Sequence, residues 1–316
     1  MANSYTGTAA ISNQTAMTNL IQTAYDKYVE MALRSMPLIR GLVDKQPVNV
    51  TAPGVTIQLA LYATELADAT TPLTENVDPD SVSLPTPGTV SLTIAEYGNA
   101  VLLTKKLGLT SLTDIDPIAV DLLAWNQAST LDSLIMSIAR QGTNVVLPTG
   151  RAATANITGT DVVTTAQIRK AVAKLRTGNA VPRVDGLYAC YIHPEVSHDL
   201  RAETTGGGFQ DLHKYAAPEN FWPGFIGTYE GAYFIESPRM YNTTDGAASA
   251  RVFRTLIAGR QFLAEAVAEE PHTVVGPVTD KLNRHRPLGW YGALGWARYR
   301  EAAGYRVEST SSIDNA

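Results

Sequence analysis

The stretch that decides the fold covers residues 55–94 and reads VTIQLALYATELADATTPLTENVDPDSVSLPTPGTVSLTI. Its two ends, residues 55–61 and 89–94, alternate apolar with small or polar side chains, which is the period of a half-buried β-strand. Residues 63–88 between them contain four prolines and most of the acids of this region. A hairpin alone is marginally stable in water, and a loop of this length is unusual in a compact domain. We therefore predict an extended arm that is stabilised by a neighbouring subunit.

Charge separates this arm from the C-terminal part of the chain. Residues 46–104 contain six carboxylates and no Lys or Arg, whereas residues 281–306 contain six Lys or Arg and one acid, Glu301. The net charge of the 316-residue chain is only −5. Because the two blocks are complementary, identical copies can meet head to tail through them. The expected inter-subunit contacts are Glu65, Asp68, Glu75, Asp78, Asp80, Lys281, Arg284 and Arg286.

Composition excludes several classes of protein. The chain is 45% hydrophobic and 17% charged, so it can bury a sizeable core in one or two domains. Its negative net charge argues against a general nucleic-acid binder, which needs a basic face. The single cysteine, Cys190, excludes an intrachain disulfide and is expected in the core. We expect no signal peptide, because residues 1–14 have neither a basic nor an apolar region of the kind that such peptides need. We expect no membrane span, because no apolar stretch approaches about 18 residues.

The strongest helical pattern covers residues 114–141, with Pro117 near its start and Gly142 after its end. Such a helix is roughly 40 Å long and would span a domain. A second amphipathic helix is predicted over residues 15–36 and is ended by Pro37. The apolar stripe expected on the longer helix consists of Ile118, Leu122, Trp125, Ser129, Leu131, Leu134, Ile135 and Ile138.

Residues 150–280 alternate between predicted helices and strands. Thr164 and Gln167 form a capping-box pattern that opens a helix, and Gly178 closes that helix. Its expected apolar face consists of Ile168, Ala171, Val172 and Leu175. Strands are predicted over residues 187–193, 232–236, 252–258 and 262–268, with a last one at 305–309.

Few residues suggest a catalytic or metal site. His193, Glu195 and His198 lie within six residues of one another. His193 falls where a strand ends and a helix begins, so the two imidazoles need not converge on one metal ion. Adjacent Glu269 and Glu270 are expected in a solvated turn rather than in acid–base catalysis. We therefore expect no catalytic residues, no metal ion and no cofactor. An enzyme built on His193, Glu195 and His198 is the alternative from a different functional class.

Several short stretches match a known family in the right order. They are Tyr62–Thr64, Pro72–Val77, Glu96–Val101, Leu131–Ser133, Gly142–Val146, Leu175–Ala180, Ile192–Glu195, Asp199–Arg201, Gly224–Gly227, Gly231 and Glu236–Ser237. Over residues 15–310 the chain resembles the major capsid proteins of tailed bacteriophages with the Hong Kong 97-type fold, in particular the family typified by phage N-four. One departure is Asn76, where the family usually has Gly. Asn tolerates the left-handed conformation, so the turn can be kept.

The resemblance implies an α+β capsid fold with named parts. Residues 1–46 would be an N-terminal arm. Residues 47–100 would be an extended loop that reaches over a neighbouring subunit. Residues 101–150 and 271–316 would form a peripheral domain, with helix 114–141 as its spine. Residues 151–270 would form an axial domain that meets its symmetry mates at the centres of hexamers and pentamers.

The function implied by the resemblance is that of a major capsid (head) protein. Copies would assemble in the host bacterial cytoplasm into the icosahedral shell of a virion, which encloses double-stranded DNA without sequence-specific binding. Further expected partners are a portal, a separate scaffolding protein and optional decoration proteins, with no membrane. The alternative with the same fold is an encapsulin-like nanocompartment shell.

Covalent cross-linking of the shell is not expected. Some relatives of this fold join subunits by a Lys–Asn bond, with the Lys on the extended loop. Residues 46–104 contain no Lys. Shell stability would therefore come from non-covalent contacts or from a cement protein.

Overall fold

The structure, a computed structural model, describes most of the chain from residue 37 onward. The described residues are 37–45, 56–61, 68–70, 72–73, 75–76, 78, 81–84, 86–111, 115–203, 227–277, 280, 282 and 284–313. The helix expected over residues 15–36 lies outside this set, as do Glu65, Asp80 and Lys281.

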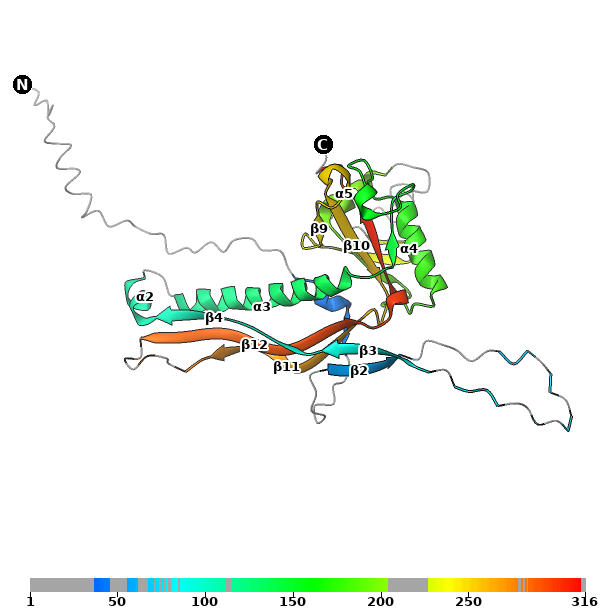
Figure 1. Cartoon of the computed structure of the whole chain (residues 1–316). Helices are drawn as coiled ribbons and strands as arrows, with labels where there is room; N and C mark the ends of the chain where they lie inside the picture. Colours follow the sequence, from blue (N-terminus) through cyan, green and yellow to red (C-terminus); the bar gives the residue numbers. More distant parts are fainter. Residues whose placement is uncertain are drawn as a thin grey trace, which may run out of the picture.

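A four-stranded sheet forms the elongated half of the molecule, in the order β1–β11–β12–β4 (Figure 1). β1 runs parallel to β11, and the other neighbours are antiparallel. The sheet consists of Val43–Lys45 (β1), Leu263–Val275 (β11), His285–Arg298 (β12) and Ala95–Thr104 (β4). A 3-10 turn, Ile39–Leu42 (η1), precedes β1, and a short helix, Lys105–Thr110 (α2), follows β4.

The long helix, Ile115–Ala139 (α3), lies along one face of this sheet (Figure 1). The predicted helix is confirmed, but its apolar stripe was only partly right. Leu131 and Ile135 are buried as expected, whereas Leu122 is exposed and Leu123 is buried in its place. Because apolar residues occupy both positions, the pattern alone does not decide which one faces the sheet.

A second sheet, of seven strands, forms the compact half of the molecule. Its order is β5–β13–β10–β6–β8–β7, and β9 pairs with β10. The strands are Val145–Val146 (β5), Tyr188–Ile192 (β6), Thr228–Tyr229 (β7), Ala232–Glu236 (β8), Asn242–Thr243 (β9), Val252–Ala258 (β10) and Gly304–Ser309 (β13). Its helices are Thr165–Thr177 (α4) and Pro194–Ala202 (α5), and short 3-10 turns lie at Thr154–Asn156 (η2), Ala247–Ser249 (η4) and Glu301–Ala303 (η5). The strands predicted in this region are confirmed.

The capping box and the apolar face of α4 are also confirmed. The side chain of Gln167 accepts a hydrogen bond from the Thr164 amide at 3.2 Å, and Gly178 follows the last helical residue. The four residues expected on the apolar face are all buried in the core.

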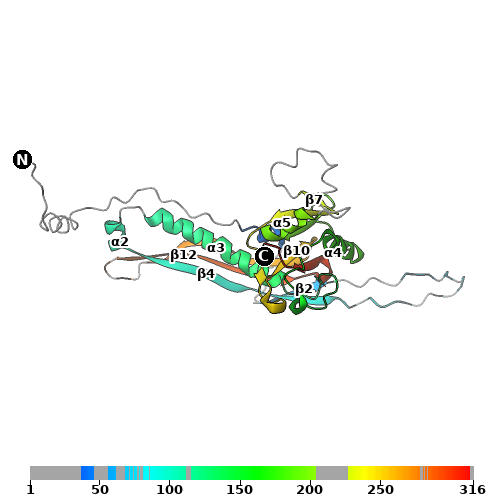
Figure 2. The ribbon, with the colours of Figure 1, turned by 90° about the horizontal axis from the view of Figure 1, so that it is seen from above.

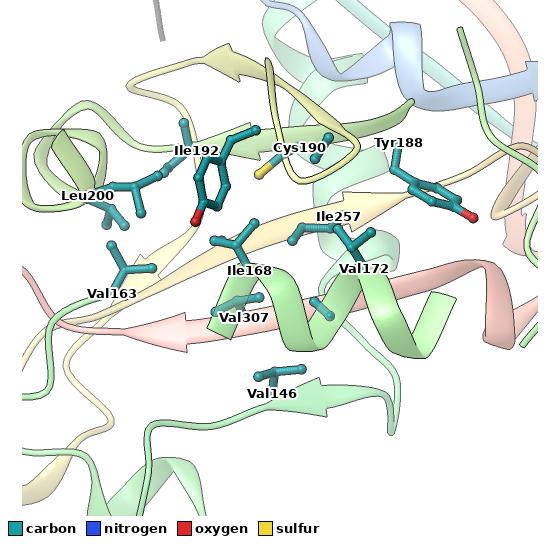
Figure 3. Close-up of a cluster of buried hydrophobic side chains, with 14 of the residues drawn as sticks. Val146, Val163, Ile168, Val172, Tyr188, Cys190, Ile192, Leu200, Ile257 and Val307 are labelled. Atoms are coloured by element: carbon teal, nitrogen blue, oxygen red, sulfur yellow. The ribbon is translucent and has the colours of Figure 1, made fainter. Parts of the chain in front are cut away.

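The two faces of the second sheet contact different parts of the molecule. Tyr188, Cys190 and Ile192 of β6 point toward the cluster that α4 and α5 contribute to (Figure 3). Ala189 and Tyr191, on the opposite face, pack in a second cluster with the C-terminal half of α3 and with η1. Strand alternation therefore lets one buried strand join the compact half to the elongated half.

The hairpin predicted at the start of the extended loop is confirmed. Thr56–Leu61 (β2) and Gly88–Thr93 (β3) pair antiparallel, with Thr56 opposite Thr93. Leu92 is buried against Ala264 and Ala266. The hairpin therefore covers the face of the four-stranded sheet opposite α3, as Figure 1 shows.

Three features of the structure differ from the sequence expectations. Glu269 and Glu270 lie inside β11 and not in a turn, and β11 continues to Val275, beyond the predicted end at residue 268. The residue pattern did not predict the strands β4 and β12. The expected domain boundary between residues 270 and 271 falls inside β11, and β13 pairs with β10 in the second sheet. Within the strand, Glu270 forms ion pairs with Arg40 and Lys45.

Candidate assembly surfaces

The extended loop leaves the hairpin and projects past the body, at the end of the molecule opposite α2 (Figures 1 and 2). Of the expected acidic contacts, Asp68, Glu75 and Asp78 are described and exposed, and none has an ion-pair partner among the described residues. The loop also exposes large apolar side chains, Leu73 at 79%, Val82 at 73% and Leu84 at 82%. Exposed apolar residues on an arm with no core of its own indicate a contact surface.

The loop contains a turn that the sequence correctly indicated. Asn76 has a φ of 66°, in the left-handed region. The family pattern has Gly at this position because Gly adopts that region without strain, and Asn is the residue that tolerates it next best. The substitution therefore keeps the path of the loop.

The basic contacts lie at the other end of the molecule. Arg284 directly precedes β12 and Arg286 is its second residue, beside the start of α2, where the Lys105 amide donates to the Arg284 carbonyl oxygen at 2.8 Å. Each has a partner within its own chain: Arg284 Nε lies 2.5 Å from Asp280, and an Nη of Arg286 lies 3.4 Å from Asp116. Both guanidinium groups remain more than half exposed. Since the acidic and basic contacts occupy opposite ends of one subunit, the pairing expected between them needs two copies.

The basic block of residues 281–306 does not form one surface, which corrects the sequence expectation. β12 is 14 residues long and carries the chain from the outer end to the compact half. There Arg298 pairs with Glu301 at 3.0 Å, and Arg306 pairs with the buried Glu308 at 2.6 Å. Only the outer part, residues 281–286, is left as a candidate contact.

His193, Glu195 and His198 form a structural corner. His193 caps α5, where its Nδ1 accepts a hydrogen bond from the Glu195 amide at 3.3 Å, and its ring packs 4.8 Å from that of Phe253. Burial lowers the pKa of His193, so the neutral ring is favoured. His198 is exposed and lies 3.3 Å from Asp199. The predicted strand-to-helix corner is confirmed, and the two imidazoles do not share an environment.

The remaining chemical groups are accounted for by the core. Cys190 is fully buried, and desolvation raises the pKa of its thiol. In the described part of the chain, no cluster of three or more His, Cys, Asp or Glu side chains is suited to hold a metal ion. No described helix is long and apolar enough to span a membrane.

Sequence patterns missed two sets of residues, one that is exposed on the loop and one that holds the subunit together. Val82 and Leu84 were not singled out, although their alternation with Ser81 and Ser83 is the pattern of an extended segment with one apolar side. The second set is the pair of buried Asp132 and mostly buried Arg239, which are 107 residues apart and join two parts of the same subunit. No local pattern could have joined them.

Comparisons with known proteins agree on the nature of this fold. Residues 9–311 match the model of a family described as phage capsid protein. Among solved structures, the capsid of cyanophage Pam1 is 15% identical, with a TM-score of 0.74, and the match covers 99% of this chain and 100% of that one. The capsid of Ralstonia phage GP4 is 14% identical, with a TM-score of 0.71 and coverage of 92% and 95%. The capsid of Helicobacter pylori bacteriophage KHP30 is 13% identical, with a TM-score of 0.71 and coverage of 98% and 99%. No curated protein matches the chain.

The fold is thus that of phage capsid proteins, and the α+β capsid fold expected from the sequence is confirmed. The chain belongs to the phage capsid protein family. It is a major capsid protein of a tailed bacteriophage and a component of the virion, as the resemblance implied. The encapsulin-like alternative is not favoured, because the matching family is one of phage capsids.

Proposed function

We propose that copies of this chain assemble through their extended loops into hexamers and pentamers, and that these close into an icosahedral shell around double-stranded DNA. The observation that carries the proposal is the loop itself. It projects beyond the subunit with exposed apolar side chains and with carboxylates that have no ion-pair partner among the described residues, while exposed arginines lie at the opposite end. Such a subunit is complementary to a second copy of itself and not to its own surface.

The contacts repeat around a closed shell, so each can be weak. Exposed ion pairs contribute about 1 kcal/mol or less. Many such contacts act together, because each bond after the first forms at a high effective concentration. The loop carries no Lys, so we propose that shell stability rests on non-covalent contacts, with a decoration protein as an optional addition.

We also propose the division of labour that the resemblance implies. The four-stranded sheet with α3 would be the peripheral domain and the seven-stranded sheet the axial domain. The latter would then include β5 and β13, which pair with each other in that sheet. Residues 1–46 would be an N-terminal arm. The negative net charge of the chain suits a shell that encloses DNA without binding it tightly.

The remaining parts of the proposal concern partners and chemistry. We propose that the shell assembles in the host bacterial cytoplasm with a portal and a separate scaffolding protein. The subunit would act through its surfaces and have no catalytic role. Metal analysis tests this last point, because stoichiometric zinc in purified protein would favour an enzyme built on His193, Glu195 and His198.

Negative-stain electron microscopy and light scattering of the purified protein test self-assembly. Closed shells, tubes, or rings of six and five subunits are expected. A protein that stays monomeric at high concentration, alone and with a co-expressed scaffold, would contradict the proposal.

Charge reversal tests the contact itself. The double variant Arg284→Glu/Arg286→Glu should fold but assemble poorly, because it places acids opposite the acidic loop. Lys170→Glu/Lys174→Glu is the control, since it changes net charge equally on the surface of α4. Reversal of Asp68, Glu75 and Asp78 to Lys should partly rescue the first variant. Normal shells from Arg284→Glu/Arg286→Glu would contradict the proposed pairing between the acidic loop and these arginines.

A further inference from the structure

The outer half of the four-stranded sheet carries a groove on the face opposite α3. The groove has a volume of about 470 Å³. We call it the sheet groove. Residues that line it come from all three neighbouring strands β4, β12 and β11 or directly follow them, and they include Gly98, Ala100, Val274, Pro287, Gly289 and Tyr291.

Glycines make the floor of the sheet groove. A Cβ at Gly289 would lie 3.0 Å from the Cβ of Ala100, and one at Gly98 would lie 2.7 Å from the carbonyl oxygen of Trp290. Both positions are therefore restricted to Gly by close approach of the strands. The result is a backbone floor bordered by Pro287 and Tyr291, which leaves space for side chains from outside.

Strand register shows which side chains face the groove. Val274 lies opposite Gly289, and Gly289 lies opposite Ala100, so all three share one face. Val275, the next residue of β11, lies opposite Leu288, which packs against α3. Val274 and Val275 thus point to opposite faces of the same strand.

The groove continues an apolar face that the chain covers only in part. Nearer the compact half, the hairpin of β2 and β3 lies on this face, with Leu92 buried there. Toward the outer end the same face is bare among the described residues, and Val274 and Leu102 are exposed. An extended segment from a second copy could therefore continue the layer that the hairpin begins.

One segment of the extended loop matches this groove in shape and charge. Residues 81–84 carry no charge, and the apolar side chains of Val82 and Leu84 alternate with serines. The acids Glu75 and Asp78 precede this segment. Arg284 and Arg286 lie at the outer end of the same sheet, where the Arg286 side chain is on the α3 side and pairs with Asp116. The inner end is acidic, because Tyr291 hydrogen-bonds Glu96 there. The loop acids are therefore favoured at the outer end.

We propose that residues 81–84 of one copy lie in the sheet groove of a second copy, with Val82 and Leu84 seated on its glycine floor. The inference rests on the proposed function, because it needs two copies in one shell, and it assigns the apolar anchor of that contact. The charged residues on either side would then set direction and specificity, while burial of the two apolar side chains supplies most of the affinity.

Disulfide trapping tests the position. Leu84→Cys combined with Val274→Cys should give covalent multimers when assembled particles are oxidised, as seen on a non-reducing gel. Leu84→Cys combined with Val275→Cys is the matched control and should not, because Val275 faces α3. The native Cys190 is fully buried and does not compete.

The outcomes separate the two proposals. Particles that form normally but show no Val274→Cys cross-link, or equal cross-linking at both positions, would overturn the groove assignment and leave shell assembly intact. If the unmodified chain forms no particles, the proposed function fails instead, and the groove assignment fails with it.

A second test uses the alternation of the segment. Leu84→Asp should raise the concentration needed for assembly by about tenfold or more, because it removes a buried leucine from the contact. Ser83→Asp adds the same charge on the other side of the segment and should have a much smaller effect. Both side chains are exposed in the subunit, so circular dichroism should be unchanged. Equal effects of the two variants would contradict the proposal.

Discussion

Asp132 shows how single residues hold the elongated and compact halves together. Its Oδ1 accepts a hydrogen bond from the Ile39 amide at 2.8 Å, and its Oδ2 accepts one from Arg239 Nε at 3.0 Å. Arg239 also donates to the carbonyl oxygen of Ser129 at 3.1 Å. Asp132 is buried, so η1, α3 and the segment after β8 meet at one neutralised charge.

The pair of Asp132 and Arg239 should therefore be costly to break. Asp132→Asn leaves the mostly buried Arg239 without its counter-charge and should lower the free energy of unfolding by about 3 kcal/mol. Asp116→Asn is the control on the same helix, since its pair with Arg286 is exposed on both sides and should contribute less than about 1 kcal/mol. Urea unfolding of disassembled subunits measures both. Equal losses would contradict this account of the junction.

At the scale of elements, β12 explains which parts of the fold the sequence could predict. α4 was predictable because its capping box, apolar face and closing Gly are all local signals. β12 was not, because its alternation is between large and small residues instead of apolar and polar ones. Its side chains toward α3 include Leu288 and Trp290, and toward the other face it carries glycine and alanine. Large apolar residues on one face and small residues on the other replace the apolar–polar alternation on which strand prediction depends.

The contact sites also show what local sequence patterns cannot predict. The charge blocks predicted complementary contacts between copies, and Asp68, Glu75, Asp78, Arg284 and Arg286 are exposed. They could not show that Arg298 and Arg306 are paired internally, because β12 and β13 place them beside Glu301 and Glu308. The sheet groove was also invisible, since it is formed by strands that are far apart in the chain.

Two glycines in different elements should respond oppositely to the same change. A Cβ at Gly295 of β12 would collide with the carbonyl oxygen of Thr93, so Gly295→Ala should push the hairpin away and cost about 2 kcal/mol of unfolding free energy. Gly108 lies in α2, where an added Cβ would meet nothing within 4 Å, and Gly108→Ala should stabilise by about 0.5–1 kcal/mol. Thermal unfolding of subunits tests the pair. A neutral Gly295→Ala would show that the hairpin is not seated there.

The stabilising effect of the ion pairs between Glu270 of β11 and Lys45 and Arg40 should depend on pH. The pKa of Glu270 is lowered from its usual 4.5, chiefly by the hydrogen bond from Lys45, with Arg40 adding to the effect against burial. A lowered folded-state pKa gives stability that is present above the unfolded pKa and is lost as the pH falls through the folded one. Glu270→Gln should therefore destabilise subunits near neutral pH, and the difference should disappear in acid. A difference that is independent of pH would contradict the ion-pair explanation.

At the scale of the whole molecule, the subunit has two ends of opposite charge and an apolar groove that no described segment covers. The acidic loop projects from the end opposite α2 (Figure 2). Arg284 and Arg286 lie at the start of β12, beside α2. Neither end has a strong role in the stability of its own chain. Their arrangement is understandable only if the functional unit is an assembly.

Assembly should then be sensitive to salt. Raising sodium chloride from about 0.1 M to about 1 M shortens the screening length from about 10 Å to about 3 Å. The concentration needed for assembly should rise, because exposed ion pairs between copies are weakened. Light scattering across a salt series measures this. In the Arg284→Glu/Arg286→Glu variant the dependence should reverse, because salt then screens repulsion between like charges. The same dependence in both proteins would argue against a charged contact at this end.

The central claim is that each extended loop is held by another copy. Electron cryomicroscopy of assembled particles, at a resolution that traces the loop, tests it most directly. The account predicts that residues 68–84 of each subunit lie on the outer half of a neighbour's four-stranded sheet, with Leu84 near that neighbour's Val274. A shell in which every loop folds back on its own subunit, or lies free of any neighbour, would contradict it.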